Sequence, residues 1–338
     1  MIDLRSDTVT RPGPGMLQAM MQAAVGDDVF REDPTVIELE QTVAGLFEME
    51  AALYCASGTM SNQVAIKCHT HPGDEVICEQ EAHVYIYEGG GIAFNSGSQV
   101  KAIAGDRGRI QAGQIPGSLN PDDVHKARTS LVCLENTSNR GGGSCYDIGE
   151  IKKIRAVCDE KKLNLHLDGA RLFNALVARN EKPPEYGRLF HSISVCFNKG
   201  LGCPVGSVLL GTAGFIHQAR RIRKVFGGGL RQAGYLAATA LYALEHQVER
   251  LAEDHAHAKQ IAAALESMPV VQSILPVETN LIIFELVPGE DPKLFAARMK
   301  AEGILLLPVS STRLRMVTHL DISSEMTDQV CRAIRNLS

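Results

Sequence analysis

Short apolar segments alternate with amphipathic segments between about residue 50 and residue 210. We predict strands where the apolar residues cluster, at 52–55, 75–78, 100–103, 131–135, 163–168, 192–197 and 206–210. We predict helices where apolar positions recur with helical spacing, over 58–68, 121–127, 148–161 and 170–178. This order predicts an α/β fold with a large, mostly parallel, seven-stranded sheet covered by helices.

The pattern changes on either side of this region. Pro34, with Asp33 as its cap, predicts a helix that continues over 35–48. Residues 211–268 are rich in Ala and Leu without a strand pattern, which predicts two or three helices. The last part predicts strands at 280–286, 304–307 and 313–318, and helices at 292–301 and 324–337. We therefore expect an N-terminal arm and large domain over 1–246, and a small C-terminal α/β domain over 247–338.

Composition narrows the class of protein. The 338 residues are 45% hydrophobic and 22% charged, which is typical of a soluble globular enzyme. A net charge of -5 favours neither nucleic acid nor an anionic membrane as partner. No apolar run approaches the ~18 residues of a membrane span, and the charged first residues do not resemble a signal peptide. Nine cysteines without a Cys-x-x-Cys pair predict reduced thiols and a cytoplasmic protein.

Two segments suggest a cofactor. Asp168 ends the predicted strand 163–168, and Lys199 lies in a glycine-flanked turn after the strand 192–197. The carboxyl ends of parallel strands form the edge of a sheet at which ligands bind. A carboxylate beside the pyridine nitrogen and a Schiff-base lysine are what pyridoxal 5'-phosphate requires. The alternatives are that Asp168 only caps the next helix and that Lys199 is a solvated turn residue.

Other motifs are weaker by themselves. Ser57-Gly58-Thr59 follows a predicted strand and opens a helix, so its amides and hydroxyls can hold a phosphate. His83 follows the strand 75–78 and can stack on a cofactor ring, although a surface histidine is the simpler interpretation. His125 lies on a short predicted helix, where solvent exposure is the default. Neither histidine has metal-ligand spacing around it, so we expect no metal.

Basic residues offer candidate anion sites. Arg313 and Arg315 alternate with apolar residues on a predicted strand, so their side chains point to one face. An arginine on that face of the small domain can bind a substrate carboxylate with two hydrogen bonds. Alternation does not decide which of the two does so. Lys224 and Arg231 flank a glycine-rich turn and can face a phosphate or a neighbouring subunit, or remain solvated.

Taken together, these residues match a family. The matching segments are 3–10 (DLRSDTVT), 26–29 (GDDV), 33–36 (DPTV), 57–59 (SGT), 134–137 (LENT), 168–171 (DGAR), 199–202 (KGLG) and 315–321 (RMVTHLD). With these motifs in this order, the chain resembles the low-specificity L-threonine aldolase family of pyridoxal-phosphate enzymes over essentially its whole length. Each motif is weak alone, but their joint presence is specific.

The resemblance implies a fold and an assembly. The fold is the aspartate-aminotransferase-like type (fold type I), and the assembly is a homotetramer of two dimers with active sites at the dimer interface. The implied cofactor-binding residues are Ser57, Gly58, Thr59, His83, Asp168, Arg171 and Lys199, with Lys224 and Arg231 from the partner subunit. The implied substrate-binding residues are Ser6, Phe30, Tyr87, Arg171 and Arg315, with His125 near the substrate side chain.

Three positions depart from the family pattern. Phe30-Arg31 stands where Tyr-Gly is common, which removes a hydroxyl and adds a charge. Asn198 precedes the lysine where Ser is usual, and Ser138 replaces a frequent His. None removes a required group, but the first can alter substrate preference.

The expected reaction is retro-aldol cleavage of L-threonine, L-allo-threonine or another β-hydroxy-α-amino acid to glycine and an aldehyde. Lys199 anchors the cofactor, Asp168 keeps its ring able to accept electrons, and His83 or His125 takes the hydroxyl proton. The alternatives are another pyridoxal-phosphate lyase or racemase acting on small amino acids, and a non-catalytic binding protein with the same fold. The sequence leaves open the preference for threo or erythro substrates and which histidine is the base.

Overall fold

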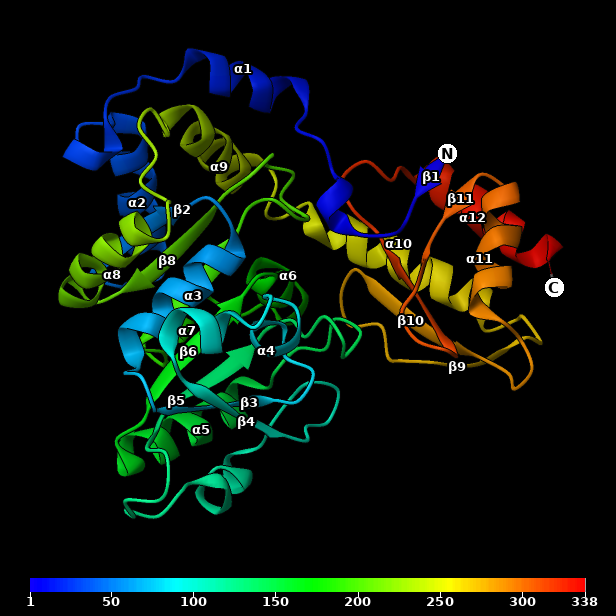
Figure 1. The fold of residues 1–338 in the computed structure, drawn as a ribbon. Coiled ribbons are helices and arrows are strands. Elements are labelled where there is room, and N and C mark those ends of the chain that lie inside the picture. Colours follow the sequence, from blue (N-terminus) through cyan, green and yellow to red (C-terminus); the bar gives the residue numbers. More distant parts are fainter. Residues whose placement is uncertain (338) are drawn as a thin grey trace.

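The computed structural model describes residues 1–337, which form a large α/β domain and a smaller one beside it (Figure 1). The large domain contains a seven-stranded sheet in the order β2 (Ala51–Cys55), β8 (Ser207–Gly211), β7 (Ser192–Cys196), β6 (Asn164–Gly169), β5 (Thr129–Glu135), β3 (Glu75–Glu79) and β4 (Gln99–Ile103). Strand β8 is antiparallel to both of its neighbours, β2 and β7, and the other six strands all run in one direction. The expected mostly parallel sheet is therefore confirmed.

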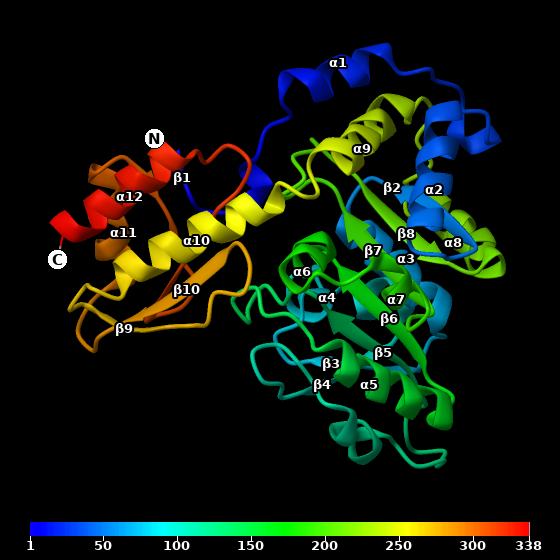
Figure 2. The ribbon, with the colours of Figure 1, turned by 180° about the vertical axis from the view of Figure 1, so that it is seen from behind.

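Helices cover both faces of this sheet (Figures 1 and 2). One face packs against α2 (Pro34–Leu46), α5 (Ile148–Lys161), α6 (Leu172–Arg179) and α9 (Gly234–His246), and forms the largest core. The other face packs against α3 (Gly58–His69) and α8 (Ala213–Val225). Helix α1 (Pro14–Gln22) lies against α9, and α7 (Pro183–Gly187) precedes β7.

Alternation along β6 separates core residues from site residues. Leu165 and Leu167 belong to the large core, so His166 and Asp168 point to the opposite face, toward α3. His166 Nε2 lies 3.2 Å from the Asn62 Oδ1 of α3. The alternation of side chains along β6 therefore places Leu165 and Leu167 in the core and the Asp168 carboxylate at the C-terminal edge of the sheet.

The small domain has an antiparallel sheet in the order β12 (Leu307–Pro308), β13 (Arg313–Val317), β10 (Leu281–Leu286) and β9 (Val271–Ile274). Its core includes side chains from α10 (Leu251–Leu265), α11 (Pro292–Ala301) and α12 (Ser324–Asn336). Helix α10 links the two domains, since Leu251 packs in the large core and Leu265 in the small one. The expected division after residue 246 falls between α9 and α10 and stays a prediction.

The N-terminal arm reaches across to the small domain. β1 (Ile2–Asp3) pairs in parallel with β11 (Ile304–Leu305), and Leu4 is buried in the small core. The sequence predicts one unit that contains this arm and the large domain, whereas among the described residues its strand pairs with β11 alone. The arm then passes the site at residues 5–8 before it joins the large domain.

The structure differs from the local predictions at several places, and α1, α7 and β1 are further elements that the sequence pattern does not predict. Residues 121–127 form turns, because the Asp123 side chain accepts a hydrogen bond from His125 N at 2.9 Å and competes with helix formation. The predicted strand 304–307 is split between β11 and β12, which pair in different sheets. Strand β9 was not predicted, because its half-exposed, partly polar residues give a weak strand pattern. Residues 211–268 do contain three helices, as expected. Within residues 1–337, no helix has the length and hydropathy needed to cross a membrane.

Candidate active site

The site forms where the carboxyl edge of the large sheet faces the small domain and the N-terminal arm. A cavity of about 490 Å³ lies there, with walls from both domains. Its lining residues are Ser6, Thr8, His83, Tyr87, Asn139, Arg140, Arg171, Lys199, Ile283, Leu307, Pro308, Val309 and Arg315. The fold therefore brings Ser6, His83, Tyr87, Arg171, Lys199 and Arg315 to one cavity, although they are spread over most of the chain.

Asp168 is buried at the end of β6, with 1% of its surface exposed. Its Oδ1 accepts a hydrogen bond from Ala170 N at 3.0 Å, but α6 begins at Leu172 with Arg171 as its cap residue and has no side-chain cap, so Asp168 does not cap this helix. Its Oδ2 is buried and has no hydrogen-bond partner among the described residues. A buried carboxylate oxygen without a donor is costly. A protonated ring nitrogen would provide that donor, which fits the expected cofactor.

The start of α3 lies at the same edge, because β2 runs parallel to β7 and β6. Ser57 caps this helix, and its Oγ accepts from Met60 N at 3.1 Å. A Cβ on Gly58 would lie 2.5 Å from Cys196 Sγ, so a larger residue would force the helix start or the Cys196 side chain at the end of β7 to shift. The first amides of α3 and the exposed Thr59 then remain available for a phosphate group.

His83 lies between three carboxylates. It begins α4 (His83–Ile86) just after β3, and its backbone N donates to Glu135 Oε2 at 2.9 Å. Its Nδ1 lies 3.1 Å from Glu88 Oε1. One ring nitrogen of His83 and one carboxylate oxygen each of Glu88 and Asp168 all lie within 4.8 Å of one another. Burial opposes protonation of the ring, but the Glu88 hydrogen bond and the nearby carboxylates outweigh it and raise the pKa of His83.

Glu135 itself is buried at the end of β5. Burial and the neighbouring Asp168 carboxylate raise the pKa of Glu135 to about 7. Sequence reasoning gave Glu135 no role, although a carboxylate that ends an apolar strand was a usable signal. Glu88 was also missed, and its position between Tyr87 and a glycine pair offers no pattern that would identify it.

Arg171 is held by a residue of the N-terminal arm. Its Nε and Nη2 each donate to a carboxylate oxygen of Asp7 at 2.7 Å, and both residues are buried. Asn280 Nδ2 of the small domain also donates to Asp7, at 3.3 Å. Burial alone would raise the pKa of Asp7, but the Arg171 guanidinium outweighs it and lowers that pKa to about 2. Asp7 thus joins the arm, the large domain and the small domain beside the cavity.

The structure distinguishes the two arginines of β13. Arg315 lines the cavity, and its guanidinium donates to Asn139 Oδ1 at 2.9 Å and to the Arg5 carbonyl at 3.0 Å. Arg313 lies on the same face but farther along the strand, where it donates to Glu285 Oε2 at 3.2 Å and is half-exposed. Arg315 is therefore the arginine that can reach a substrate carboxylate from within this chain.

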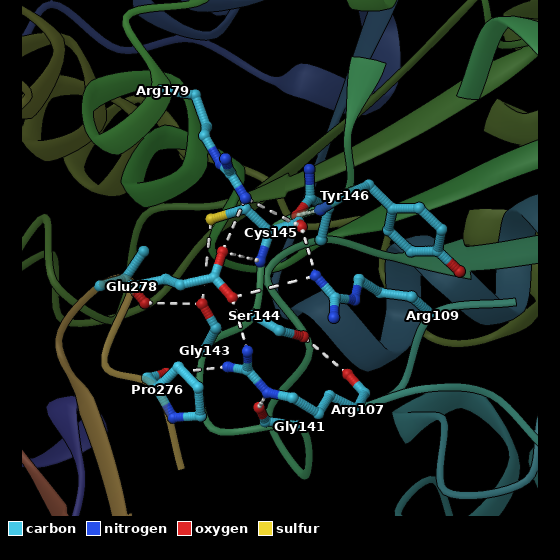
Figure 3. A network of polar contacts seen from close by, with 12 residues as sticks. Arg107, Arg109, Gly141, Gly143, Ser144, Cys145, Tyr146, Arg179, Pro276 and Glu278 are labelled. Atoms are coloured by element: carbon cyan, nitrogen blue, oxygen red, sulfur yellow. Dashed lines mark hydrogen bonds and ion pairs between the residues drawn. The ribbon is translucent and has the colours of Figure 1, made fainter. Parts of the chain in front are cut away.

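A second polar cluster joins the two domains around Glu278 (Figure 3). Glu278, just before β10, accepts from Arg107 Nη1 at 2.8 Å and from Arg179 Nη2 at 2.7 Å. It also accepts from Cys145 N at 3.2 Å, and Arg107 Nε donates to the Gly141 carbonyl at 3.2 Å. These contacts hold the loop that carries Asn139, the partner of Arg315.

Four predicted site residues lie away from this cavity. The side chain of His125 is 84% exposed and contacts Asp123, so its expected place beside the substrate is not reached within one chain. Phe30 is 69% exposed, with the Arg231 guanidinium 6.0 Å from its ring centroid. Arg231 pairs with Asp27 at 2.9 Å, and Lys224 lines a different cavity. The roles of these four residues stay predictions that concern an assembly of chains.

Comparisons with known proteins agree with this geometry. The model of the beta-eliminating lyase family matches residues 3–287. The chain is 42% identical to the low specificity L-threonine aldolase of Escherichia coli strain K12, over 98% of this chain and 97% of that protein. It is 38% identical to the low-specificity L-threonine aldolase 1 of Arabidopsis thaliana, with 96% and 92% covered. The solved structure of a Leishmania major threonine aldolase has the same fold, with a TM-score of 0.87 at 20% identity over 100% of this chain and 99% of that one.

Proposed function

The chain belongs to the beta-eliminating lyase family, and from that premise we propose that it is a pyridoxal-phosphate-dependent threonine aldolase. This carbon–carbon lyase cleaves L-threonine, L-allo-threonine and related β-hydroxy-α-amino acids to glycine and an aldehyde. The observation that carries the proposal is the buried, unpartnered Asp168 Oδ2 at the sheet edge that also presents Lys199. The aldolase relatives, matched over nearly their whole length, support the choice of reaction.

Residues of the large domain hold the cofactor. Pyridoxal phosphate, when bound, supplies an aromatic ring that accepts the electron pair of the broken Cα–Cβ bond. Asp168 would hold a proton on the ring nitrogen, and Lys199 would provide the amine that anchors the group before the substrate amine binds. The first amides of α3, with Ser57 and Thr59, would bind the phosphate, and His83 would contact the ring.

Residues of the arm and the small domain hold the substrate. Arg315 binds the carboxylate with two hydrogen bonds, with Ser6 and Arg171 beside it. Fixing the carboxylate would set the orientation of the Cα–Cβ bond and so select the bond that breaks. Of the two candidate histidines, only His83 lines the cavity of this chain, so His83 is our choice for the base that takes the β-hydroxyl proton.

We further propose a homotetramer of two dimers with sites at the dimer interface. Apolar side chains are exposed at Ile86, at Tyr87, which also lines the cavity, and at Phe94, which has 89% of its surface exposed. A second chain that covers this surface would remove these side chains from water. We propose that it would also bring its own Lys224 and Arg231 toward the phosphate bound by the first chain. We place the enzyme in the cytoplasm, because its nine cysteines are all free thiols.

The test is a set of measurements on the purified protein. We expect a visible absorbance band after addition of pyridoxal phosphate, and its absence in Lys199→Ala. We then expect kcat/KM for L-threonine or L-allo-threonine to exceed that for their D-forms and for a β-substituted alanine. Activity on the substituted alanine alone would favour the alternative of another lyase, and a band that survives in Lys199→Ala would reject the assigned lysine.

A further inference from the structure

Glu88 is a buried carboxylate outside the catalytic set just described. Its side chain has 0% exposure, and both oxygens accept hydrogen bonds from amide groups of α3. Asn62 Nδ2 donates to Oε1 at 2.9 Å, and Gln63 Nε2 donates to Oε2 at 2.6 Å. His83 Nδ1 also contacts Oε1, at 3.1 Å. Two side chains of one helix therefore fix the carboxylate against the histidine ring.

The wider network sets the direction of these hydrogen bonds. Asn62 Oδ1 lies 3.2 Å from His166 Nε2, and His166 Nδ1 lies 2.8 Å from Ser192 Oγ. With its oxygen facing His166, Asn62 must turn its NH₂ group toward Glu88. Each oxygen of Glu88 already accepts from an amide, and a carboxylate offers only acceptors to a further partner. The contact with His83 can then be made only if Nδ1 carries a hydrogen.

From this arrangement we propose that Glu88 is a positioning residue that fixes His83 as the Nδ1–H tautomer and leaves Nε2 free to take a proton. Imidazole has one bare nitrogen when neutral, and the hydrogen bond at the other nitrogen decides which one it is. The use of Nε2 as the catalytic base rests on the proposed function. The tautomer itself is a property of the folded chain and does not depend on the reaction.

The other titratable groups around His83 do not replace Glu88. They are Asp168 on β6, Glu135 on β5, Tyr87 after α4, and Lys199 and Arg171 in the cavity wall. Glu135 contacts the backbone N of His83, and Tyr87 contacts the ring only through its aromatic face at 5.8 Å between centroids. Among the described residues, Glu88 alone makes a hydrogen bond with the ring.

The tautomer can be measured directly by ¹⁵N NMR on protein labelled at histidine, with assignment from His83→Gln. We expect the wild-type signal of His83 above its pKa to show a protonated Nδ1 and a bare Nε2. In Glu88→Gln we expect a lower pKa for His83 and loss of the single tautomer, because the amide can donate to Nδ1. Glu40→Gln is the matched control, since Glu40 is also buried and accepts from Tyr54 N and Arg220 but lies apart from His83.

Kinetics supply the second readout. We expect Glu88→Gln to lower kcat about tenfold or more with little change in KM, and to shift the acid limb of the kcat/KM profile to lower pH. A wild-type His83 in the Nε2–H form, or a Glu88→Gln protein with unchanged His83 signals, would overturn the proposal. The wild-type measurement decides the tautomer even if Glu88→Gln fails to fold. If the expected tautomer is found in a protein that does not cleave threonine, only the proposed function fails.

Discussion

Arg171 and Asp7 form a buried ion pair with two parallel hydrogen bonds of 2.7 Å, although they are far apart in the chain. The pair joins the N-terminal arm to the strand-end segment that follows Asp168. Because both partners are buried, each charge depends on the other for the interaction that offsets its loss of water. Arg171 is therefore a cavity residue whose place is set by the arm, which also supplies Ser6.

We expect Asp7→Asn to leave the Arg171 charge buried without a carboxylate. Loss of one partner of a buried pair typically costs about 3–5 kcal/mol of unfolding free energy. We also expect a higher KM for L-threonine, because Arg171 loses its fixed position beside the substrate carboxylate. Denaturant unfolding and steady-state kinetics measure the two effects. The control is Asp3→Asn, which removes a partly exposed pair with Arg5 on the same arm; equal effects from both variants would contradict the prediction.

The same pair predicts an acid sensitivity. The pKa of Asp7 is about 2 in the folded protein, below its ordinary value of 3.8. A lowered carboxyl pKa stabilises the fold above the ordinary value, and this contribution is lost as pH falls through the folded pKa. We therefore expect the stability difference between wild type and Asp7→Asn to be full at pH 6 and to shrink between about pH 4 and pH 2. A difference that stays constant over this range would contradict the assigned pKa.

Asp168→Asn tests the electron-accepting role of the ring. The amide keeps the size of the side chain but no longer stabilises a proton on the ring nitrogen. We expect the cofactor to remain bound, as seen from its absorbance, while kcat for L-threonine falls at least a hundredfold, since each ~1.4 kcal/mol of lost transition-state stabilisation costs a factor of ten. Near-normal turnover would remove this role from Asp168.

Arg315 and Arg313 form a matched pair on one strand. We expect Arg315→Lys to raise KM for L-threonine about tenfold or more, because lysine cannot make the two-pronged contact with a carboxylate. Arg313→Lys should leave KM unchanged, since Arg313 contacts Glu285 outside the cavity. Kinetics with both variants decide between them, and the reverse ranking would move the carboxylate site to Arg313.

Glu278 offers a test of coupling between the domains. We expect Glu278→Gln to weaken the contacts with Arg107 and Arg179 and to lower the unfolding free energy by about 1–3 kcal/mol. It should also raise KM modestly, because the loop with Asn139 then holds Arg315 less firmly. Glu285→Gln is the control, since it breaks a more exposed pair on the small domain alone. A stable Glu278→Gln protein with unchanged KM would show that the cluster does not support the site.

Much of this site was predictable because strand ends are local features. The apolar run 163–168 and the turn after 192–197 place Asp168 and Lys199 at one edge as soon as the sheet is parallel, and the order of strands and helices indicates that it is. The family motifs added Ser6, Arg171 and Arg315, which no local pattern joins to that edge.

What the sequence determined by itself was therefore the α/β class, the cofactor chemistry and the candidate residues, since periodicity and strand ends are set by neighbouring side chains. Only the tertiary structure decided which residues meet. It attached the arm to the small domain, placed Asp7 on Arg171 and Glu88 on His83, and put Arg315 rather than Arg313 in the cavity. The reason is physical: these relations arise from packing between segments distant in the chain, which desolvates charged groups and forces each to find a partner.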